Sequence, residues 1–201
     1  MKLKLPYILL AIYLLVFLAC GLDPYDRAVW WAENLPIVIL VAIVAWLHRN
    51  HQFSHTSYFF MAFLIILHTI GGHYTFERVP FDWVTDYFNF ERNHYDRLAH
   101  FSVGFYAFPI AEILLRGKRV QSSFIILTYP ILAIVTLAGV YEIFEWQYAV
   151  SADEEAGIAV LGSQGDIWDA QKDILADTLG SIFAITIFYY RYHRNLKQLN
   201  S

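Results

Sequence analysis

Six long apolar stretches dominate the pattern of hydrophobic and polar positions along the chain. None of them alternates apolar and polar residues as a half-buried strand does, and all are too long for ordinary strands, so the pattern predicts helices. A helix needs about 20 apolar residues to cross the hydrocarbon core of a bilayer. The predicted spans are Leu5–Leu22, Leu35–Leu47, Tyr58–Ile70, Leu98–Leu115, Phe124–Trp146 and Ile174–Tyr190.

The second and third stretches are short for a membrane crossing. The second can extend back through Trp30–Asn34 and the third forward through His73, provided that the polar side chains there face protein rather than lipid. The sequence therefore predicts an all-α polytopic membrane bundle of about six transmembrane helices. We expect residues 1–201 to form a single integral membrane domain.

Composition supports a membrane protein. The chain is 58% hydrophobic and only 16% charged, whereas soluble domains are closer to a quarter charged. Its single cysteine, Cys20, excludes an internal disulfide and a metal site built from thiolates. The basic residues before the first apolar run also resemble a signal peptide, and Cys20 lies in a loose lipoprotein-type context. We expect an uncleaved first helix, with cleavage or lipidation at Cys20 as the alternative.

Lysine and arginine set the expected orientation, because cytoplasmic loops carry an excess of both. With the N-terminus in the cytoplasm, nine of these residues lie on the cytoplasmic side and five outside, and six spans return the C-terminus to the cytoplasm. The nine are Lys2, Lys4, Arg49, Arg116, Lys118, Arg119, Arg191, Arg194 and Lys197. The five are Arg27, Arg78, Arg92, Arg97 and Lys172.

Acidic residues are distributed even more unevenly. Of the 18 Asp and Glu residues, only Glu112 lies toward the cytoplasmic side, which leaves 17 in outer loops or at outer helix ends. The positive-inside rule does not require this bias, since it concerns Lys and Arg. Five outer Lys and Arg residues cannot pair with all of these acids, so some acids need another partner or a cation.

Four aspartates stand at the start of the last span, in GSQGDIWDAQKDILADTLGS. On a helix, Asp166, Asp169, Asp173 and Asp177 fall within about 80° and form one stripe, with Lys172 pointing elsewhere. Like charges on one face repel each other unless cations or protons intervene. We interpret Asp166 as a helix cap or first-turn acid and expect Asp173 and Asp177 to have a function.

The outer ends of three other spans carry ionisable groups at the same depth. The third ends in HTIGGHY, where Gly71 and Gly72 are expected to break the helix and to let backbones approach closely. The fourth begins NHYDRLAHFSVGF, which places Asp96 and His100 on one helix face. Polar groups at matching depth usually face one interior cavity. The predicted cavity residues are His68, His73, His94, Asp96, Arg97, His100, Glu142, Glu145, Asp169, Asp173 and Asp177.

Carboxylates together with neutral imidazoles are typical ligands of Zn, Mn, Fe or, with fewer histidines, Mg. Such a metal could activate water or polarise a phosphoryl or carbonyl oxygen. For catalysis we predict Glu145 or Asp96 as general base and Arg97 as the contact for an anionic group of the substrate. The predicted metal ligands are His68, His73, His100, Glu142, Asp169, Asp173 and Asp177.

Each element also has a non-catalytic interpretation. His68 could be a packed core residue, Asp96 and Arg97 could serve as a helix cap and a salt bridge, and Glu142 and Glu145 could end a helix near water. The chain contains no metal motif of fixed spacing and no glycine-rich phosphate loop. Basic-aromatic patches are absent as well, so no nucleic-acid partner is expected.

In the blocks HTIGGHY, NHYDRLAHFSVGF, EIFEW and GSQGDIWDAQKDILADTLG the chain resembles the YjdF-like family of bacterial inner-membrane proteins. The resemblance extends over nearly the whole chain and implies a multi-pass protein of the bacterial inner membrane, but no activity. Asp173, Asp177 and Gly180 also resemble VanZ-like membrane proteins over a segment too short to imply function. The CDP-alcohol phosphotransferase motif is not matched, because D-G-x-x-A-R is missing before D-x-x-x-D.

Three functional hypotheses follow from the sequence. The leading one is a metal-dependent enzyme that faces the periplasm, sits among membrane lipids and acts on an amphiphilic lipid or cell-envelope substrate. An ion- or proton-coupled transporter is the second, although only Ser102, Thr128 and Thr136 continue the polar groups inward. The third is a structural protein locked by salt bridges, which would require the outer acids to be matched by bases.

Overall fold

The computed structural model describes residues 4–118, 120–152, 154–161 and 163–199, so the charges of Lys2 and Arg119 lie outside the described part. Within these residues, six helices are long and apolar enough to span a membrane, as predicted. Five of them are α1 (Leu5–Leu22), α2 (Arg27–Asn50), α3 (His55–Tyr74), α7 (Ser123–Ser151) and α9 (Asp169–Gln198). The sixth comprises α5 (Tyr95–Val103), the 3₁₀ turn η1 (Gly104–Tyr106) and α6 (Ala107–Arg116). The short helices α4 (Asp82–Phe88) and α8 (Glu154–Leu161) lie in connections.

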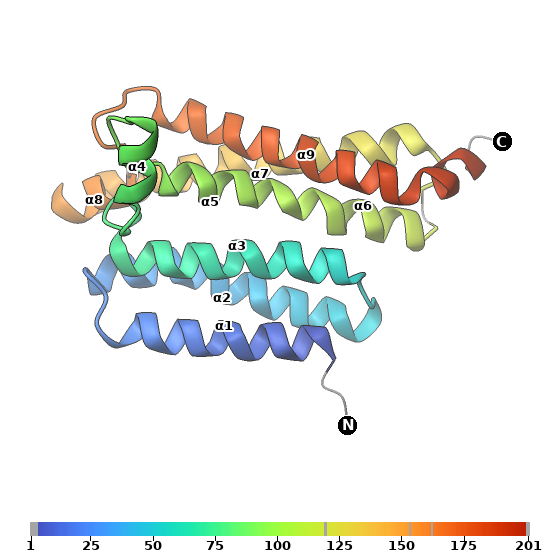
Figure 1. The fold of residues 1–201 in the computed structure, drawn as a ribbon, viewed down its shortest axis with the longest axis horizontal. Coiled ribbons are helices and arrows are strands. Elements are labelled where there is room, and N and C mark those ends of the chain that lie inside the picture. Colours follow the sequence, from blue (N-terminus) through green and yellow to red (C-terminus); the bar gives the residue numbers. More distant parts are fainter. Residues whose placement is uncertain (1–3, 119, 153, 162, 200–201) are drawn as a thin grey trace.

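The spans run up and down in two groups, with α1, α2 and α3 on one side and α5–α6, α7 and α9 on the other (Figure 1). We call the end with α4, α8 and residues 23–26 the acidic end, and the end with residues 51–54, 117–122 and both termini the basic end. Helix α9 packs on α5 and α7, and α3 packs on α1, α2 and α5. Within the described ranges, α2 packs on α3 and α8 but has no extensive contact with α7. Which end faces the cytoplasm stays a prediction.

The two short stretches are lengthened as predicted, and a local cap explains where α2 begins. The Asp26 carboxylate accepts hydrogen bonds from the backbone N–H groups of Ala28 and Val29, at 2.7 and 2.9 Å, and so caps α2. In the added segment Glu33 and Asn34 are 3% and 0% exposed. They therefore face protein, as the hydrocarbon environment requires.

The expected helix break at Gly71 and Gly72 is wrong, because α3 continues through both to Tyr74. The expected close approach is present. A Cβ on Gly72 would lie 3.1 Å from the Cβ of Glu33 and 2.6 Å from Nδ2 of Asn34. Gly72 therefore lets α2 press against α3 without interrupting the helical hydrogen bonds, whereas a Cβ on Gly71 would meet the ring of Phe76.

The helices α5 and α9 cross with their backbones in contact. A Cβ on Gly180 would lie 2.8 Å from the carbonyl carbon of Phe101, and one on Gly104 would overlap backbone atoms of Gly180 and Ser181. Small residues at a membrane helix crossing permit this approach. The crossing sets the face of α5 that carries His100 against the aspartates of α9.

A layer of aromatic side chains lies between α3, the η1–α6 segment and α9. This aromatic layer consists of Phe60, Phe105, Phe108 and Phe188, all buried. The ring centroids of Phe60 and Phe105 are 4.7 Å apart, and those of Phe108 and Phe188 are 5.2 Å apart. Along α3, the α5–α6 span and α9, the layer lies between the polar residues of the acidic end and those of the basic end.

Candidate functional site

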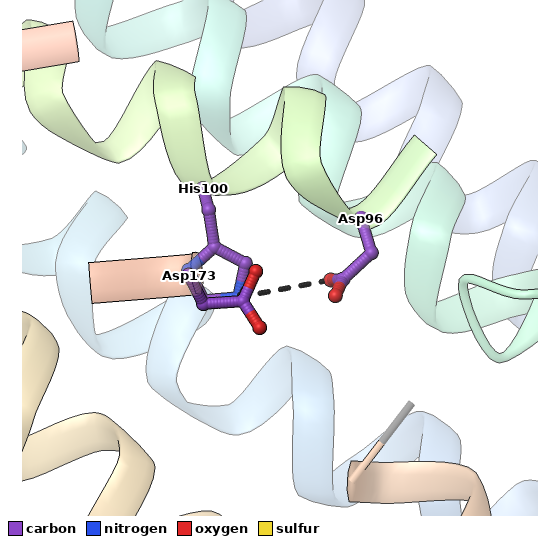
Figure 2. Close-up of side chains that lie close together, drawn as sticks. All are labelled: Asp96, His100 and Asp173. Atoms are coloured by element: carbon purple, nitrogen blue, oxygen red, sulfur yellow. Dashed lines mark ion pairs between the residues drawn. The ribbon is translucent and has the colours of Figure 1, made fainter. Parts of the chain in front are cut away.

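A buried group of three ligand-type side chains lies where α5 faces α9 at the acidic end. Nε2 of His100 is 3.7 Å from Oδ1 of Asp96 and 3.7 Å from Oδ1 of Asp173. Figure 2 shows the three side chains directed toward one another. One donor atom of each lies within 4.8 Å of the others, which is close enough for one ion to contact all three.

The second ring nitrogen of His100 faces a fourth residue, Asp177, whose Oδ2 is 3.3 Å from Nδ1. When Nδ1 carries the proton and donates a hydrogen bond to Asp177, Nε2 presents a lone pair toward Asp96 and Asp173. A carboxylate that fixes the histidine tautomer in this way is a recurrent feature of metal sites.

Several buried carboxylate oxygens near this group have no hydrogen-bond partner among the described residues. They are Oδ1 of Asp177, Oδ2 of Asp169 and Oε1 of Glu142. An unpartnered buried polar atom is costly, and an unpartnered buried charge more so. A cation, a proton or ordered water at these oxygens would remove that cost.

Two arginines bind the outer aspartates of α9. The Arg97 guanidinium donates to the carboxylates of Asp169 and Asp173. Arg92 donates to Asp169 Oδ1 at 2.6 Å and to the Ser163 carbonyl at 3.1 Å. Arg97 therefore ties α5 to α9, and a metal in the group would share Asp173 with this guanidinium.

Three of the four aspartates in the predicted stripe lie on the helix, because α9 begins at Asp169. Asp166 precedes it and accepts hydrogen bonds from the Trp168 backbone N–H at 3.0 Å and from Lys172 Nζ at 2.5 Å. The prediction that Lys172 points away from all four aspartates is therefore wrong. The Lys172 ammonium and the Trp168 N–H hold the pKa of Asp166 below its usual range.

A second polar group faces the first from α2, α3 and α7. Oε2 of Glu33 lies 3.1 Å from Nε2 of His68 and accepts a hydrogen bond from the Tyr141 hydroxyl at 3.0 Å. Glu33 and Tyr141 were not among the predicted site residues. For Glu33 the signal was present, since it is the acid within the segment that was used only to lengthen the second span.

A cavity of about 240 Å³ joins the two polar groups. On one side it continues along apolar residues of α2 and α7, including Ile39 and Leu137. These two are 52% and 53% exposed on the outside of the bundle, so the apolar wall reaches the lipid-facing surface where α2 and α7 are loosely packed. The polar wall consists of Glu33, His68, Asp96, His100, Tyr141, Glu145 and Asp177.

The predicted site residues thus do not all lie in one place. Asp96, His100, Asp173 and Asp177 form the group on α5 and α9, and His68 and Glu145 line the same cavity. Arg97 and Asp169 are engaged in ion pairs, while Glu142 is half-buried near His100.

Two predicted cavity residues lie elsewhere. Nδ1 of His73 is 2.7 Å from the Cys20 carbonyl, so this histidine fastens α3 to α1, and its predicted place at the shared cavity is not observed. His94 stacks edge-on against Phe90 before α5 begins. Burial, with smaller contributions from nearby Arg92, Arg97 and Lys172, lowers its pKa.

Comparison with known proteins places this architecture in a family. The chain is 30% identical to the inner membrane protein YjdF of Escherichia coli (strain K12) over 181 residues, which cover 89% of this chain and 86% of YjdF. No solved structure matches this chain. The family described as predicted membrane protein (DUF2238) matches residues 5–195. The chain therefore belongs to the DUF2238 family of multi-pass membrane proteins, as its resemblance to YjdF-like inner-membrane proteins implied.

Proposed function

We propose that Asp96, His100 and Asp173 bind a divalent cation and that the adjoining cavity uses it to act on an amphiphilic molecule, a lipid or a cell-envelope intermediate. The observation that carries this proposal is the placement of His100. One ring nitrogen faces two carboxylates at 3.7 Å, and the other is held by Asp177.

The charge balance supports a cation. Two arginines reach the outer aspartates: both approach Asp166, which precedes α9, and Asp169 in its first turn, and Arg97 also binds Asp173. A divalent ion would compensate the deeper carboxylates. Two carboxylates and one imidazole favour Mn, Fe or Zn over Mg, which prefers oxygen ligands alone.

The cavity lining supports an amphiphilic substrate. A bound cation would activate water or polarise a phosphoryl or carbonyl oxygen. Glu145 lines the cavity as a candidate general base, and Tyr141 and His68 are placed to hold a polar group of the substrate. At about 240 Å³ the cavity fits the reacting part of a lipid. An acyl chain would continue past Ile39 and Leu137 into the bilayer.

The polar side chains between the cavity and the basic end favour chemistry at one side over transport across the membrane. Ser102 donates its hydroxyl hydrogen bond to the Ala99 carbonyl. Thr128 and Thr136 donate theirs to carbonyls of their own helix, α7. The aromatic layer therefore separates the cavity from the basic end. By the distribution of Lys and Arg, we infer that the cavity faces the periplasm.

Metal analysis of the purified protein tests the cation. The full chain is prepared in detergent without chelators, as wild type and as Asp96→Asn, Asp173→Asn and Asp86→Asn variants, and metals are measured by mass spectrometry before and after supply of Mn, Fe, Zn and Mg. Asp86 is an exposed residue of α4 and controls for the loss of one acid. We expect about one equivalent of metal in the wild type and in Asp86→Asn, and at least tenfold weaker binding in both site variants.

Equal metal binding in the site variants and in Asp86→Asn would overturn the metal site. If Asp173→Asn lowers the melting temperature but leaves binding unchanged, Asp173 is only the partner of Arg97. The chemical step is tested by incubating the metal-loaded protein with a bacterial lipid extract and comparing products with those of Glu145→Gln. Metal binding with no product in the wild type would reject catalysis and keep the binding site.

A further inference from the structure

A larger cavity opens at the basic end, independent of the proposed function. It encloses about 960 Å³ between the start of α3, the end of α6 and the end of α9.

The charged groups of this cavity are all basic. Arg116, Lys118 and Arg191 line it, and no carboxylate does so within the described part of the chain. Cations gathered from α9 and from the α6–α7 connection repel one another unless an anion lies between them. The cavity is therefore electrostatically the opposite of the site at the acidic end.

A buried acid fixes one of these cations in place. Glu112 is fully buried and accepts hydrogen bonds from the Ser54 backbone N–H at 3.0 Å, from the Ser57 hydroxyl and from Arg116 at 2.6 Å. Arg116 also donates to the Gln52 carbonyl at 3.0 Å. Although anchored on both partners, its side chain remains 46% exposed, so an anion in the cavity can approach it.

The rest of the lining is half polar and half apolar. Gln121 and Asn195 offer amide groups, whereas Phe53, Leu115 and Val120 form an apolar wall. A soluble phosphate would use only the polar part. A phospholipid headgroup with its glycerol and first acyl carbons would use both parts, and it is better matched to the large volume.

The depth of the cavity also matches a lipid. Arg116 is the last residue of α6, and Arg191 lies about two turns before the end of α9. Both therefore lie toward the helix ends, where spanning helices leave the hydrocarbon core. Basic pockets between transmembrane helices at this level bind anionic lipid headgroups. We propose that this cavity binds the headgroup of an anionic membrane phospholipid.

Lipid binding to the full-length protein tests this proposal. The protein in detergent is titrated with phosphatidylglycerol or phosphatidylcholine and the bound lipid is measured by native mass spectrometry. The test variant is Lys118→Gln with Arg191→Gln. The control is Arg194→Gln with Lys197→Gln, which removes the same charge from positions of α9 that do not line the cavity. Arg116 is left intact because it compensates Glu112.

We expect the wild type and the control to prefer phosphatidylglycerol, and the test variant to bind it about fivefold more weakly for each cation removed. Equal loss in the control would show nonspecific attraction and overturn the site. Equal binding of both lipids would also overturn it. Inorganic phosphate is titrated in a parallel thermal-shift measurement. Stronger stabilisation by phosphate than by phosphatidylglycerol would assign the cavity to a soluble anion instead.

Discussion

The close crossing of α5 and α9 predicts that Gly180→Ala damages both the fold and the candidate site. The new Cβ would lie 2.8 Å from the Phe101 carbonyl carbon, whereas carbon atoms in contact are about 3.5 to 4.0 Å apart. The Phe101 carbonyl oxygen would lie closer still, so the helices must separate by at least about 1 Å. Overpacking of this kind costs about 1–3 kcal/mol.

Gly139→Ala is the matched control, because a Cβ there meets nothing within 4 Å. Both variants gain the same helix propensity from alanine, about 1 kcal/mol at most, so their difference isolates the crossing. For a chain of this size 1 kcal/mol corresponds to about 2–4 °C. We expect Gly180→Ala to melt about 2–12 °C below Gly139→Ala in detergent.

Metal titration of the same two variants gives a second readout. Separation of α5 from α9 moves His100 away from Asp173 and Asp177, so we expect at least tenfold weaker metal binding in Gly180→Ala. Melting temperatures within 1 °C of each other, together with equal metal affinities, would refute the argument that this backbone contact positions the site.

Three further changes test other parts of the structure. Asp177→Asn should weaken metal binding by about 10- to 100-fold in a metal titration, because it removes the carboxylate that orients His100, and a lack of change would exclude that role. Arg97→Gln should lower the free energy of unfolding by about 3 kcal/mol, measured by denaturant titration. This is the lower end of the cost of breaking a buried ion pair, because the Arg97 side chain is 15% exposed. The pKa of His94 is lowered in the folded protein, mainly by burial and further by nearby cations, so the unfolded chain binds more protons below about pH 6.5. The contribution of His94 to stability should therefore be fully present above that pH, and the melting temperature should fall as the pH is lowered toward 5. His94→Gln should reduce this fall. An unchanged dependence of the melting temperature on pH in the variant would contradict the argument.

Hydropathy predicted the number and order of the spans because the bilayer imposes length and apolarity on each helix separately. The ends of the second span were harder to place. Glu33 and Asn34 interrupt the apolar run, and only their burial against α3 shows that α2 continues through them. The predicted helix break at Gly71 and Gly72 was wrong for the same reason, since the effect of a glycine depends on which neighbour packs against it.

The same distinction, between features of one helix and contacts between helices, applies to the candidate site. The spacing of Asp96 and His100, and the stripe on α9, could be predicted because both are periodic features of a single helix. The partners of Arg97 and the contact between Glu33 and Tyr141 join helices distant in sequence, so no local pattern encodes them. His73 is of a residue type that often binds metals, but its position is set by its contact with α1.

The aromatic layer has an electrical consequence. Water-free apolar material carries most of the voltage drop across a membrane protein, and a full crossing at 100 mV changes the energy of a unit charge by about 2.3 kcal/mol. Because Phe60, Phe105, Phe108 and Phe188 lie beyond the carboxylates, an ion that enters from the acidic end stops before this field. Its occupancy should follow the ion concentration on that side and respond little when the membrane is depolarised.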